Sequence, residues 1–446
     1  MQPVNQQTLF FGIANMTKPY SSQQIIFALN SMANAPSGLH GTVREFEEFA
    51  QNVITATLDN GEVKQLVGEW KLVWGPAVYQ VHDAVYDSTV ADNSMYVAQS
   101  VNEPTCFVVA ISGTNPISMY GWICEDLMIN PPQSWRYSTD CPSQAKISNG
   151  TQVGLDALLD MRSGGKTLIE YLKGQTVSVL TVTGHSLGGA LSPALALALK
   201  NLQSQWDVTS TAKIAVMPTA GPTPGNKAWA DYYDLQLGKT TDRLWNALDI
   251  VPHAWELDML SELPTLYEPY IPKSDLVVFF VQIAEANSRH AGDMWQIRHD
   301  VRGLSYQVQL VKATVEFIRF VLDTLKRSDL LEKIFKQRYP DSFIAMDDHV
   351  EQAGTVVRDL IRSIADRESD ESISRSELIS IMRENNQMRS RDCETRRLVE
   401  SFIDQLLDFI LFLAQAVYQH TSAYAEIIGT KEFACLYSYI RTHTVF

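Results

Sequence analysis

The chain has 446 residues, of which 45% are hydrophobic and 20% are charged, and its formal net charge is −15. This length exceeds that of a usual single domain but fits one large domain with an insertion, and it allows a sizeable core. A nucleic-acid partner is not expected, because phosphate binding needs a basic face and the sequence contains no run rich in Lys or Arg.

The five cysteines are scattered and form no CxxC pair or Cys/His cluster, so we expect neither a disulfide framework nor structural zinc. Residues 1–20 lack a basic region followed by an apolar one. We therefore expect no secretory signal in this chain, which leaves a cytoplasmic protein or a mature secreted form. The most apolar window, Phe409–Tyr418, is about half the length of a membrane span, so we expect a buried helix and no transmembrane segment.

The first hundred residues predict two helices, over Gln23–Ala35 and Val43–Ala56, and then two strands, over Trp70–Trp74 and Ser94–Ala98. The next apolar run, Cys106–Ile111, ends at a Gly-Thr turn. A short apolar run that ends at a turn is typical of a central strand.

Strand and helix patterns then alternate. The sequence predicts strands over Val177–Thr183, Lys213–Met217 and Arg243–Leu248, with intervening helices over Ala190–Lys200 and near Lys227–Leu235. This alternation predicts an α/β fold whose mostly parallel sheet is covered on both faces.

A helical period dominates from about residue 256 to residue 401. The apolar positions that follow it are Val311, Val315, Ile318, Leu322 and Leu325 on one face, and Ala353, Val356, Leu360 and Ile364 on another. We therefore predict a helical block over 256–401.

A candidate nucleophile lies in the segment Gly184–Gly188, between the predicted strand Val177–Thr183 and the predicted helix Ala190–Lys200. Glycines on both sides of Ser186 permit a tight turn that lifts its hydroxyl above the sheet. The backbone N–H of Leu187, at the start of the helix, is then available to stabilise an oxyanion. The alternative is a glycine-rich turn with a solvated serine.

Four segments together resemble the class 3 (fungal-type) lipase family of the α/β-hydrolases: Gly184–Ala190, Gly113–Thr114, Gly221–Asn226 and Asn246–Pro252. The resemblance covers about residues 65–253 and resumes near residue 420. It implies an α/β-hydrolase fold with the order Ser, Asp, His along the chain.

On this basis we predict one catalytic domain over 1–446. Its core spans about 65–253 and 411–446, with helices within about 1–60. The block over 256–401 is then a large helical insertion between the acid and the histidine, and a possible cap.

The resemblance implies that Asp249, which heads the Asp-Ile-Val-Pro segment, is the acid of the triad. Its alternative role is a helix or turn cap. Asp231, Asp234 and Asp242 are competitors without motif support.

Position must choose the base among nine histidines. His420 is preferred because it follows an apolar helix and precedes a short segment with an aromatic residue, which resembles the carboxyl end of the family. His290 and His299 remain alternatives. His253 lies too close in sequence to the acid, and His185 is expected to be a structural neighbour of the nucleophile.

The resemblance also implies that Thr114 is the second oxyanion donor beside Leu187, although an ordinary Gly-Thr turn is the alternative. Two short segments depart from the family pattern. Ile111 and Ser112 stand where the family usually has Phe-Arg, and residues 152–155 replace its His-x-Gly-Phe element. These departures bear on the subgroup and the substrate more than on the reaction.

Large apolar side chains fill the region where the family has a lid, and both a mobile lid and buried core are compatible with them. They are Met119, Tyr120, Trp122, Ile123, Leu127, Met128 and Trp135.

An acidic stretch in the helical block resembles an EF-hand loop, with oxygen ligands available from Asp366, Glu368, Asp370, Ser372, Ser374 and Glu377. Glu371 stands where such a loop needs glycine, and no second loop is visible, so a solvated link between helices is the preferred interpretation. No cofactor is expected.

The sequence thus predicts a serine ester hydrolase that acts on acylglycerols, with Ser186 as nucleophile, His420 as base and Asp249 as acid. A phospholipase A1 and a short-chain or feruloyl-type esterase are alternatives within the enzyme class. A catalytically silent lipase-like binding or signalling module is the alternative outside it. The expected partner is a lipid or small ester, at a lipid–water interface where the substrate forms one. The acidic balance favours neutral lipid over strongly anionic membranes.

Overall fold

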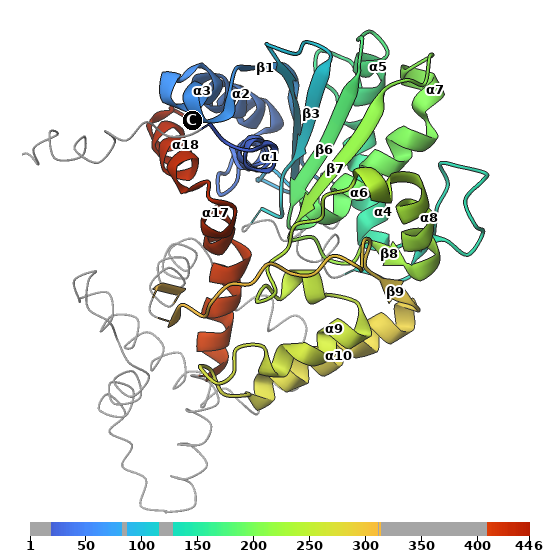
Figure 1. Cartoon of the computed structure of the whole chain (residues 1–446), viewed down its shortest axis with the longest axis vertical. Helices are drawn as coiled ribbons and strands as arrows, with labels where there is room; N and C mark the ends of the chain where they lie inside the picture. The colour runs from blue at the N-terminus through green and yellow to red at the C-terminus, as the bar shows by residue number, and fades with distance from the viewer. Residues whose placement is uncertain (1–18, 83–86, 116–127, 311, 314–407) are drawn as a thin grey trace, which may run out of the picture.

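The computed structural model describes residues 19–82, 87–115, 128–310, 312–313 and 408–446. Its centre is a five-stranded sheet with the order β1-β2-β3-β6-β7 (Figure 1). The strands are β1 (Trp70–Tyr79), β2 (Asn93–Ser100), β3 (Cys106–Ile111), β6 (Val179–His185) and β7 (Lys213–Thr219).

The sheet is parallel in one half only. β1 with β2 and β2 with β3 pair antiparallel, whereas β3, β6 and β7 run parallel. The expectation of a mostly parallel sheet therefore holds for the half that carries β6. In that half Ile111 pairs with Gly184 and Gly184 pairs with Pro218, so the three strands end in one row. The loops that follow them meet at a single edge of the sheet, which is where ligands bind in folds of this kind.

The predicted strand Arg243–Leu248 is wrong as a regular strand. The chain beside β7 makes only single bridges, from Thr241 to Val216 and from Leu244 to Thr219. Beyond Leu244 it turns to a different partner, because Trp245 and Ala247 exchange backbone hydrogen bonds with Leu304. An apolar run divided between two partners does not form a continuous ladder.

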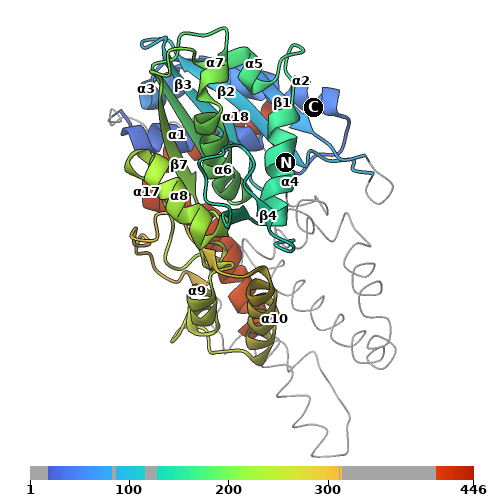
Figure 2. The ribbon, with the colours of Figure 1, turned by 90° about the vertical axis from the view of Figure 1, so that its right-hand side faces the viewer.

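Helices cover both faces of the sheet, as Figures 1 and 2 show. On one face lie α1 (Ser22–Ser31), α2 (Val43–Asp59), α3 (Gly61–Val67) and α18 (Lys431–His443). On the other lie α4 (Asn149–Asp160), α5 (Leu168–Leu172), α6 (Leu187–Asn201), α7 (Gln203–Trp206) and α8 (Lys227–Leu237). Short 3-10 turns are η2 (Met32–Asn34), η4 (Gly238–Thr240), η5 (Val251–His253) and η6 (Leu263–Thr265).

Alternation along the strands builds two separate cores. Tyr96 and Val108 pack with the helices of the α1 face, whereas Met95, Val97 and Val109 pack with those of the α6 face. Successive side chains of a strand point to opposite faces, so one sheet supports both layers. Capping boxes at Ser21 and Thr42 begin α1 and α2, close to the starts that the sequence predicts.

A third apolar core lies beyond the carboxyl edge of the sheet. It joins α9 (Leu257–Glu262) and α10 (Asp275–Ala291) to a helix over 408–420, which leads through α17 (Ser422–Ile428) back to α18 (Figure 1). The apolar window Phe409–Tyr418 thus belongs to a largely buried helix, as expected. Among the described helices, none is long and apolar enough to cross a bilayer.

The block over 256–401 is not helical throughout. β9 (Met294–Trp295) lies within it and joins a four-stranded sheet with β4 (Gln133–Ser134), β5 (Lys146–Ile147) and β8 (Gly225–Asn226). Residues 292–308, which include this strand, contain no helix. The apolar positions on which the prediction rests, from Val311 to Ile364, lie outside the described residues. The division into core and insertion therefore stays a prediction.

Candidate active site

Ser186 occupies a sharp turn between β6 and α6. Its backbone has φ 60° and ψ −124°, a left-handed conformation that a residue with a side chain rarely adopts. Its N–H donates to the carbonyl of Thr219 at 3.0 Å, which ties the turn to the end of β7. The turn directs the Ser186 hydroxyl away from the sheet, as a nucleophile elbow requires.

Backbone contacts around this turn leave no room for side chains. A Cβ on Gly184 would lie 2.0 Å from the Gly188 oxygen, and one on Gly188 would lie 2.6 Å from the Ser112 oxygen. A Cβ on Gly189 would lie 2.4 Å from the Thr219 oxygen. The three glycines therefore let α6 pack directly on the ends of β3 and β7.

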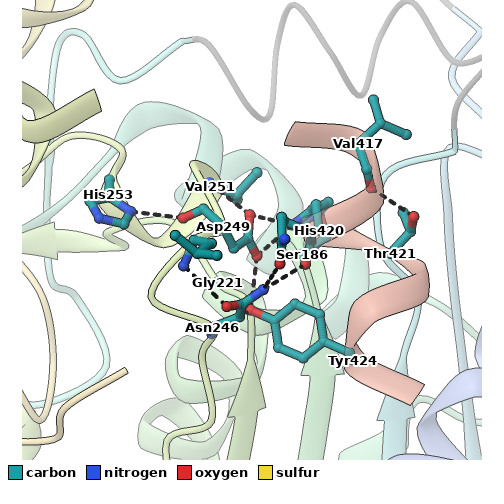
Figure 3. Close-up of polar contacts among 12 residues, drawn as sticks. Ser186, Gly221, Asn246, Asp249, Val251, His253, Val417, His420, Thr421 and Tyr424 are labelled. Atoms are coloured by element: carbon teal, nitrogen blue, oxygen red, sulfur yellow. Dashed lines mark hydrogen bonds and ion pairs between the residues drawn. The ribbon is translucent and has the colours of Figure 1, made fainter. Parts of the chain in front are cut away.

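Three side chains from separate parts of the chain form one hydrogen-bonded row (Figure 3). His420 Nε2 lies 2.7 Å from Ser186 Oγ, and His420 Nδ1 lies 3.0 and 2.9 Å from the two carboxylate oxygens of Asp249. An ionised carboxylate can only accept a hydrogen bond, so Nδ1 must carry a proton and donate to Asp249. Nε2 is then unprotonated and accepts a hydrogen bond from the Ser186 hydroxyl. The row can thus take a proton from Ser186 and stabilise the resulting imidazolium.

Asp249 is fully buried, which is costly for a carboxylate unless its oxygens are paired. The hydroxyl of Tyr424 donates to Oδ2 at 2.8 Å, and the N–H of Val251 donates to Oδ1 at 3.0 Å. Burial, and then the negative charge of Asp249, raise the pKa of Tyr424 well above its usual value, so this hydroxyl keeps its proton. These donors and His420 hold the carboxylate in one orientation.

His253 supports the same loop from the other side. Its Nδ1 lies 2.7 Å from the backbone oxygen of Asp249, so Nδ1 must donate. Burial lowers the pKa of His253, which favours the neutral ring that makes this bond. The structure thus gives His253 a role in holding Asp249 and not the role of base.

The ring of His185 lies beside the row. Its ring centroid is 4.9 Å from that of His420 and 5.2 Å from that of Tyr424. Burial, and then repulsion by His420, lower the pKa of His185 to about 3. A neutral His185 places no second positive charge beside the imidazolium that His420 would become.

The loop after β3 lies directly against the serine. A Cβ on Gly113 would come within 3.3 Å of the Ser186 Cβ. Side chains from the first helices fix this loop: Asn34 accepts from the Gly113 N–H at 3.0 Å, and Asn30 donates to the Ile111 oxygen at 2.9 Å. Thr114 follows in the chain and therefore lies at the same edge.

Leu187 is the first residue of α6. The first N–H groups of a helix have no acceptor within that helix and favour negative charge. The N–H of Leu187 and that of Thr114 are thus placed at the edge where Ser186 lies, and their oxyanion roles stay predictions.

Comparisons with known proteins identify the family of the chain. The family model for lipase (class 3) matches residues 108–259. The crystal structure of M37 lipase is 30% identical, with a TM-score of 0.58, and the match covers 65% of this chain and 86% of that one. The chain belongs to the class 3 lipase family. The α/β-hydrolase fold that the resemblance implied is thereby confirmed.

One curated relative is similar over a shorter stretch. A secreted mono- and diacylglycerol lipase of Malassezia globosa is 30% identical over 178 residues. This match covers 39% of the chain and 55% of the relative, so the chain spans about half the length of the curated relative that it matches.

The other candidate acids are engaged elsewhere. Asp231 accepts from Lys227 Nζ at 2.7 Å, Asp234 accepts from the Arg298 N–H, and Asp242 accepts from Gln23 Nε2 at 2.8 Å. The structure therefore brings none of the three to His420.

The other candidate bases have different surroundings as well. Nε2 of His299 lies 2.8 Å from the carboxylate of Glu256, and its ring stacks on Trp295. His290 lies exposed in the last turn of α10. Neither histidine contacts Ser186 or Asp249.

The lid region of the class 3 family is only partly described here. Trp135 is buried in the core of the α6 face, where its Nε1 donates to Asn201 at 2.8 Å, so it is core and not lid. Met128 is 39% exposed. The other proposed lid residues, Met119, Tyr120, Trp122, Ile123 and Leu127, lie outside the described residues.

The proposed calcium ligands, Asp366 to Glu377, also lie outside the described residues. Within the part of the chain that the structure describes, no group of three or more His, Cys, Asp or Glu side chains could hold a metal ion.

The sequence assigns no role to two residues that contact the row. Tyr424 is the aromatic residue that follows His420, and Asn246 lies in one of the segments that resemble the family. Asn246 is fully buried, and its N–H donates to the Tyr424 hydroxyl at 3.0 Å. No sequence spacing links positions that are 178 residues apart.

Proposed function

We propose that this chain is a carboxylic ester hydrolase that cleaves acylglycerols through an acyl-enzyme on Ser186. The observation that carries the proposal is the continuous row from Ser186 Oγ through His420 to the buried carboxylate of Asp249. Membership of the class 3 lipase family supports the same reaction. No cofactor takes part.

In the first half of the reaction, the Ser186 oxygen adds to the ester carbonyl while its proton passes to His420 Nε2. The N–H groups of Leu187 and Thr114 donate hydrogen bonds to the tetrahedral oxyanion. Stabilisation of this negative charge is usually the largest single contribution to catalysis of acyl transfer. His420 then gives the proton to the leaving alcohol, and the acyl group stays on Ser186. Water repeats these steps and releases the acid, while Asp249 keeps His420 in one tautomer.

Two observations support an acylglycerol as the substrate. The matched relative from Malassezia globosa is named as a lipase of mono- and diacylglycerols. The net charge of −15 favours a neutral lipid or soluble ester over a strongly anionic membrane. The same relative is named as secreted, which favours a secreted protein over a cytoplasmic one.

A fluorophosphonate probe tests the nucleophile. The intact protein should be labelled on Ser186, and Ser186→Ala should abolish both labelling and ester hydrolysis. An unlabelled wild-type protein with an ordered, folded site would favour the catalytically silent module.

Paired substitutions test the base and the acid. His420→Ala should lose almost all activity, whereas His290→Ala, at an exposed site on α10, should retain it. Asp249→Asn should lower kcat by about 10⁴-fold, because an amide stabilises the wrong histidine tautomer. Full activity in the His420 variant would refute the assignment of His420 as the base.

Hydrolysis rates for monoacylglycerol, triacylglycerol, phosphatidylcholine and short-chain esters test the substrate. Acylglycerols should be cleaved fastest. Faster release from phosphatidylcholine would indicate a phospholipase A1, and cleavage of short-chain or feruloyl esters alone would indicate an esterase.

A further inference from the structure

The residue before the proposed base is buried, although it has a polar side chain. Gln419 and its neighbour Asn246 both have an exposed fraction of 0%. A buried amide is costly unless its donors and acceptor are paired. The partners of these two amides therefore indicate what the residues do.

The two side chains join the acid segment to the histidine helix. Asn246 Nδ2 donates to Gln419 Oε1 at 2.6 Å and lies 3.2 Å from the backbone oxygen of Gln419. Gln419 Nε2 in turn donates to the backbone oxygen of Gln307 at 2.9 Å. We call the pair the Asn246–Gln419 bridge, and we call residues 304–309 the strap.

Asn246 also holds the acid directly. Its backbone oxygen accepts from the Asp249 N–H at 2.9 Å, and its own N–H donates to the hydroxyl of Tyr424. That hydroxyl donates to Asp249 Oδ2 at 2.8 Å. One residue thus contacts the acid, the tyrosine that orients the acid, and the residue adjacent to the base.

The strap makes a second, independent contact with the same helix. Gln415 lies one turn before Gln419, is also fully buried, and its Oε1 accepts from the Gln309 N–H at 3.1 Å. This contact does not include Asn246. Figure 1 shows the strap, in orange, crossing the red helix that ends at His420.

We propose that Gln419 and Asn246 are positioning residues, which set His420 at hydrogen-bond distance from Asp249. The inference rests on the proposed function of Ser186, His420 and Asp249. The acid and the base are 171 residues apart in the chain, so no local backbone geometry fixes their separation. The Asn246–Gln419 bridge supplies that constraint, since it ties a residue hydrogen-bonded to Asp249 to the residue directly before His420.

Gln419→Met is the main test, because methionine keeps the length of the side chain and removes its hydrogen bonds. The readout is kcat and KM for a soluble short-chain ester, with kcat expressed per serine labelled by a fluorophosphonate probe. The side chains of Gln419 and Asn246 are both fully buried and are not exposed to a substrate, so KM should change less than about twofold. A displaced base should lower kcat by about tenfold to a hundredfold, as misplacement by about 1 Å does.

Gln415→Met is the matched control. It removes a bond from the same strap to the same helix at an equally buried glutamine, but it leaves the bridge intact. Its kcat per labelled serine should stay within about twofold of the wild type. Equal losses in the two variants, or an unchanged kcat in the Gln419 variant, would overturn the proposal.

Gln419→Asn serves as a second variant where methionine prevents folding. It keeps a polar amide, but it is one methylene too short to reach both Asn246 and Gln307. The same loss of kcat is expected, and wild-type kcat per labelled serine would again overturn the proposal. A wild-type protein that neither labels nor hydrolyses esters would instead refute the proposed function, so the two failures are distinguishable.

Discussion

The nucleophile and the base are held in different ways. Ser186 is fixed by backbone packing within six consecutive residues, because Gly184, Gly188 and Gly189 bring α6 against the strand ends. His420 is fixed by side-chain hydrogen bonds from segments far away in the chain, including Asp249. The first arrangement depends on the absence of side chains, and the second depends on their presence.

The difference predicts which substitutions each region tolerates. Around Ser186, a substitution that adds one carbon should be tolerated less well than one that changes the polarity of a side chain. Around His420, a substitution that removes one polar atom should be tolerated less well than one that changes the volume of a side chain. Three experiments can break or sharpen this contrast.

Gly184→Ala should have the largest effect. The added Cβ would lie 2.0 Å from the Gly188 oxygen and 2.2 Å from its carbonyl carbon, and backbone cannot move aside as a flexible side chain can. We expect the free energy of unfolding to fall by about 3 kcal/mol or more, the upper end of overpacking. The midpoint of urea denaturation measures this loss.

Gly61→Ala is the control for that experiment. Gly61 begins α3, and a Cβ there would meet nothing within 4 Å. The substitution should stabilise the protein by up to about 1 kcal/mol, because alanine loses less backbone entropy in a helix. Equal midpoints for the two variants would contradict the packing explanation.

Tyr424→Phe should have an intermediate effect. The change leaves Asp249 one donor short and leaves the buried Asn246 N–H without its acceptor. We expect the free energy of unfolding to fall by about 1–3 kcal/mol, the cost of a buried unsatisfied group, and kcat to fall with it. Denaturation and ester hydrolysis measure the two losses.

Tyr437→Phe provides the matched comparison. The Tyr437 hydroxyl is buried and, within the part of the chain that the structure describes, has no hydrogen-bond partner. Removing this hydroxyl should leave the free energy of unfolding unchanged or raise it. No hydrogen bond is lost, and the cost of burying an unpaired polar atom is removed. If both variants lose the same stability, the hydroxyl of Tyr424 has no special role.

The same contrast explains what could be predicted from the sequence. The Ser186 turn is a contiguous motif, and the β3 strand appears as an isolated apolar run, so both were located to within a residue or two. Asp249 and His420 came from a family resemblance, and the structure brings them together with Ser186.

The surroundings of the base could not be predicted in that way. Tyr424, Asn246 and Gln419 act through contacts between segments more than 170 residues apart, and no spacing records such contacts. The segment Arg243–Leu248 misled for a related reason. Its apolar pattern fits a strand, but its backbone is shared between β7 and the strap.

His185→Gln should have the smallest effect and tests the boundary between the two regions. His185 belongs to the nucleophile motif by sequence, but its ring packs against His420 and Tyr424. Its folded-state pKa of about 3 lies below the value of about 6.5 for an unfolded histidine. Between these values the unfolded chain binds a proton that the folded chain does not, so stability declines as pH falls from about 6.5 to about 3.

Removing the imidazole should make the free energy of unfolding depend less on pH between about 3 and about 6.5. At pH 7.5 it should change the free energy of unfolding little, because this imidazole is mostly neutral in both the folded and the unfolded chain. The free energy of unfolding, measured at a series of pH values for wild type and variant, gives the difference in slope. Proton NMR of the ring supplies an independent readout, because the His185 signals should not shift between pH 7 and pH 4.5. Protonation of the His185 ring near pH 6 would show that the site tolerates a second cation beside His420. It would contradict the conclusion that His185 is kept neutral next to the base.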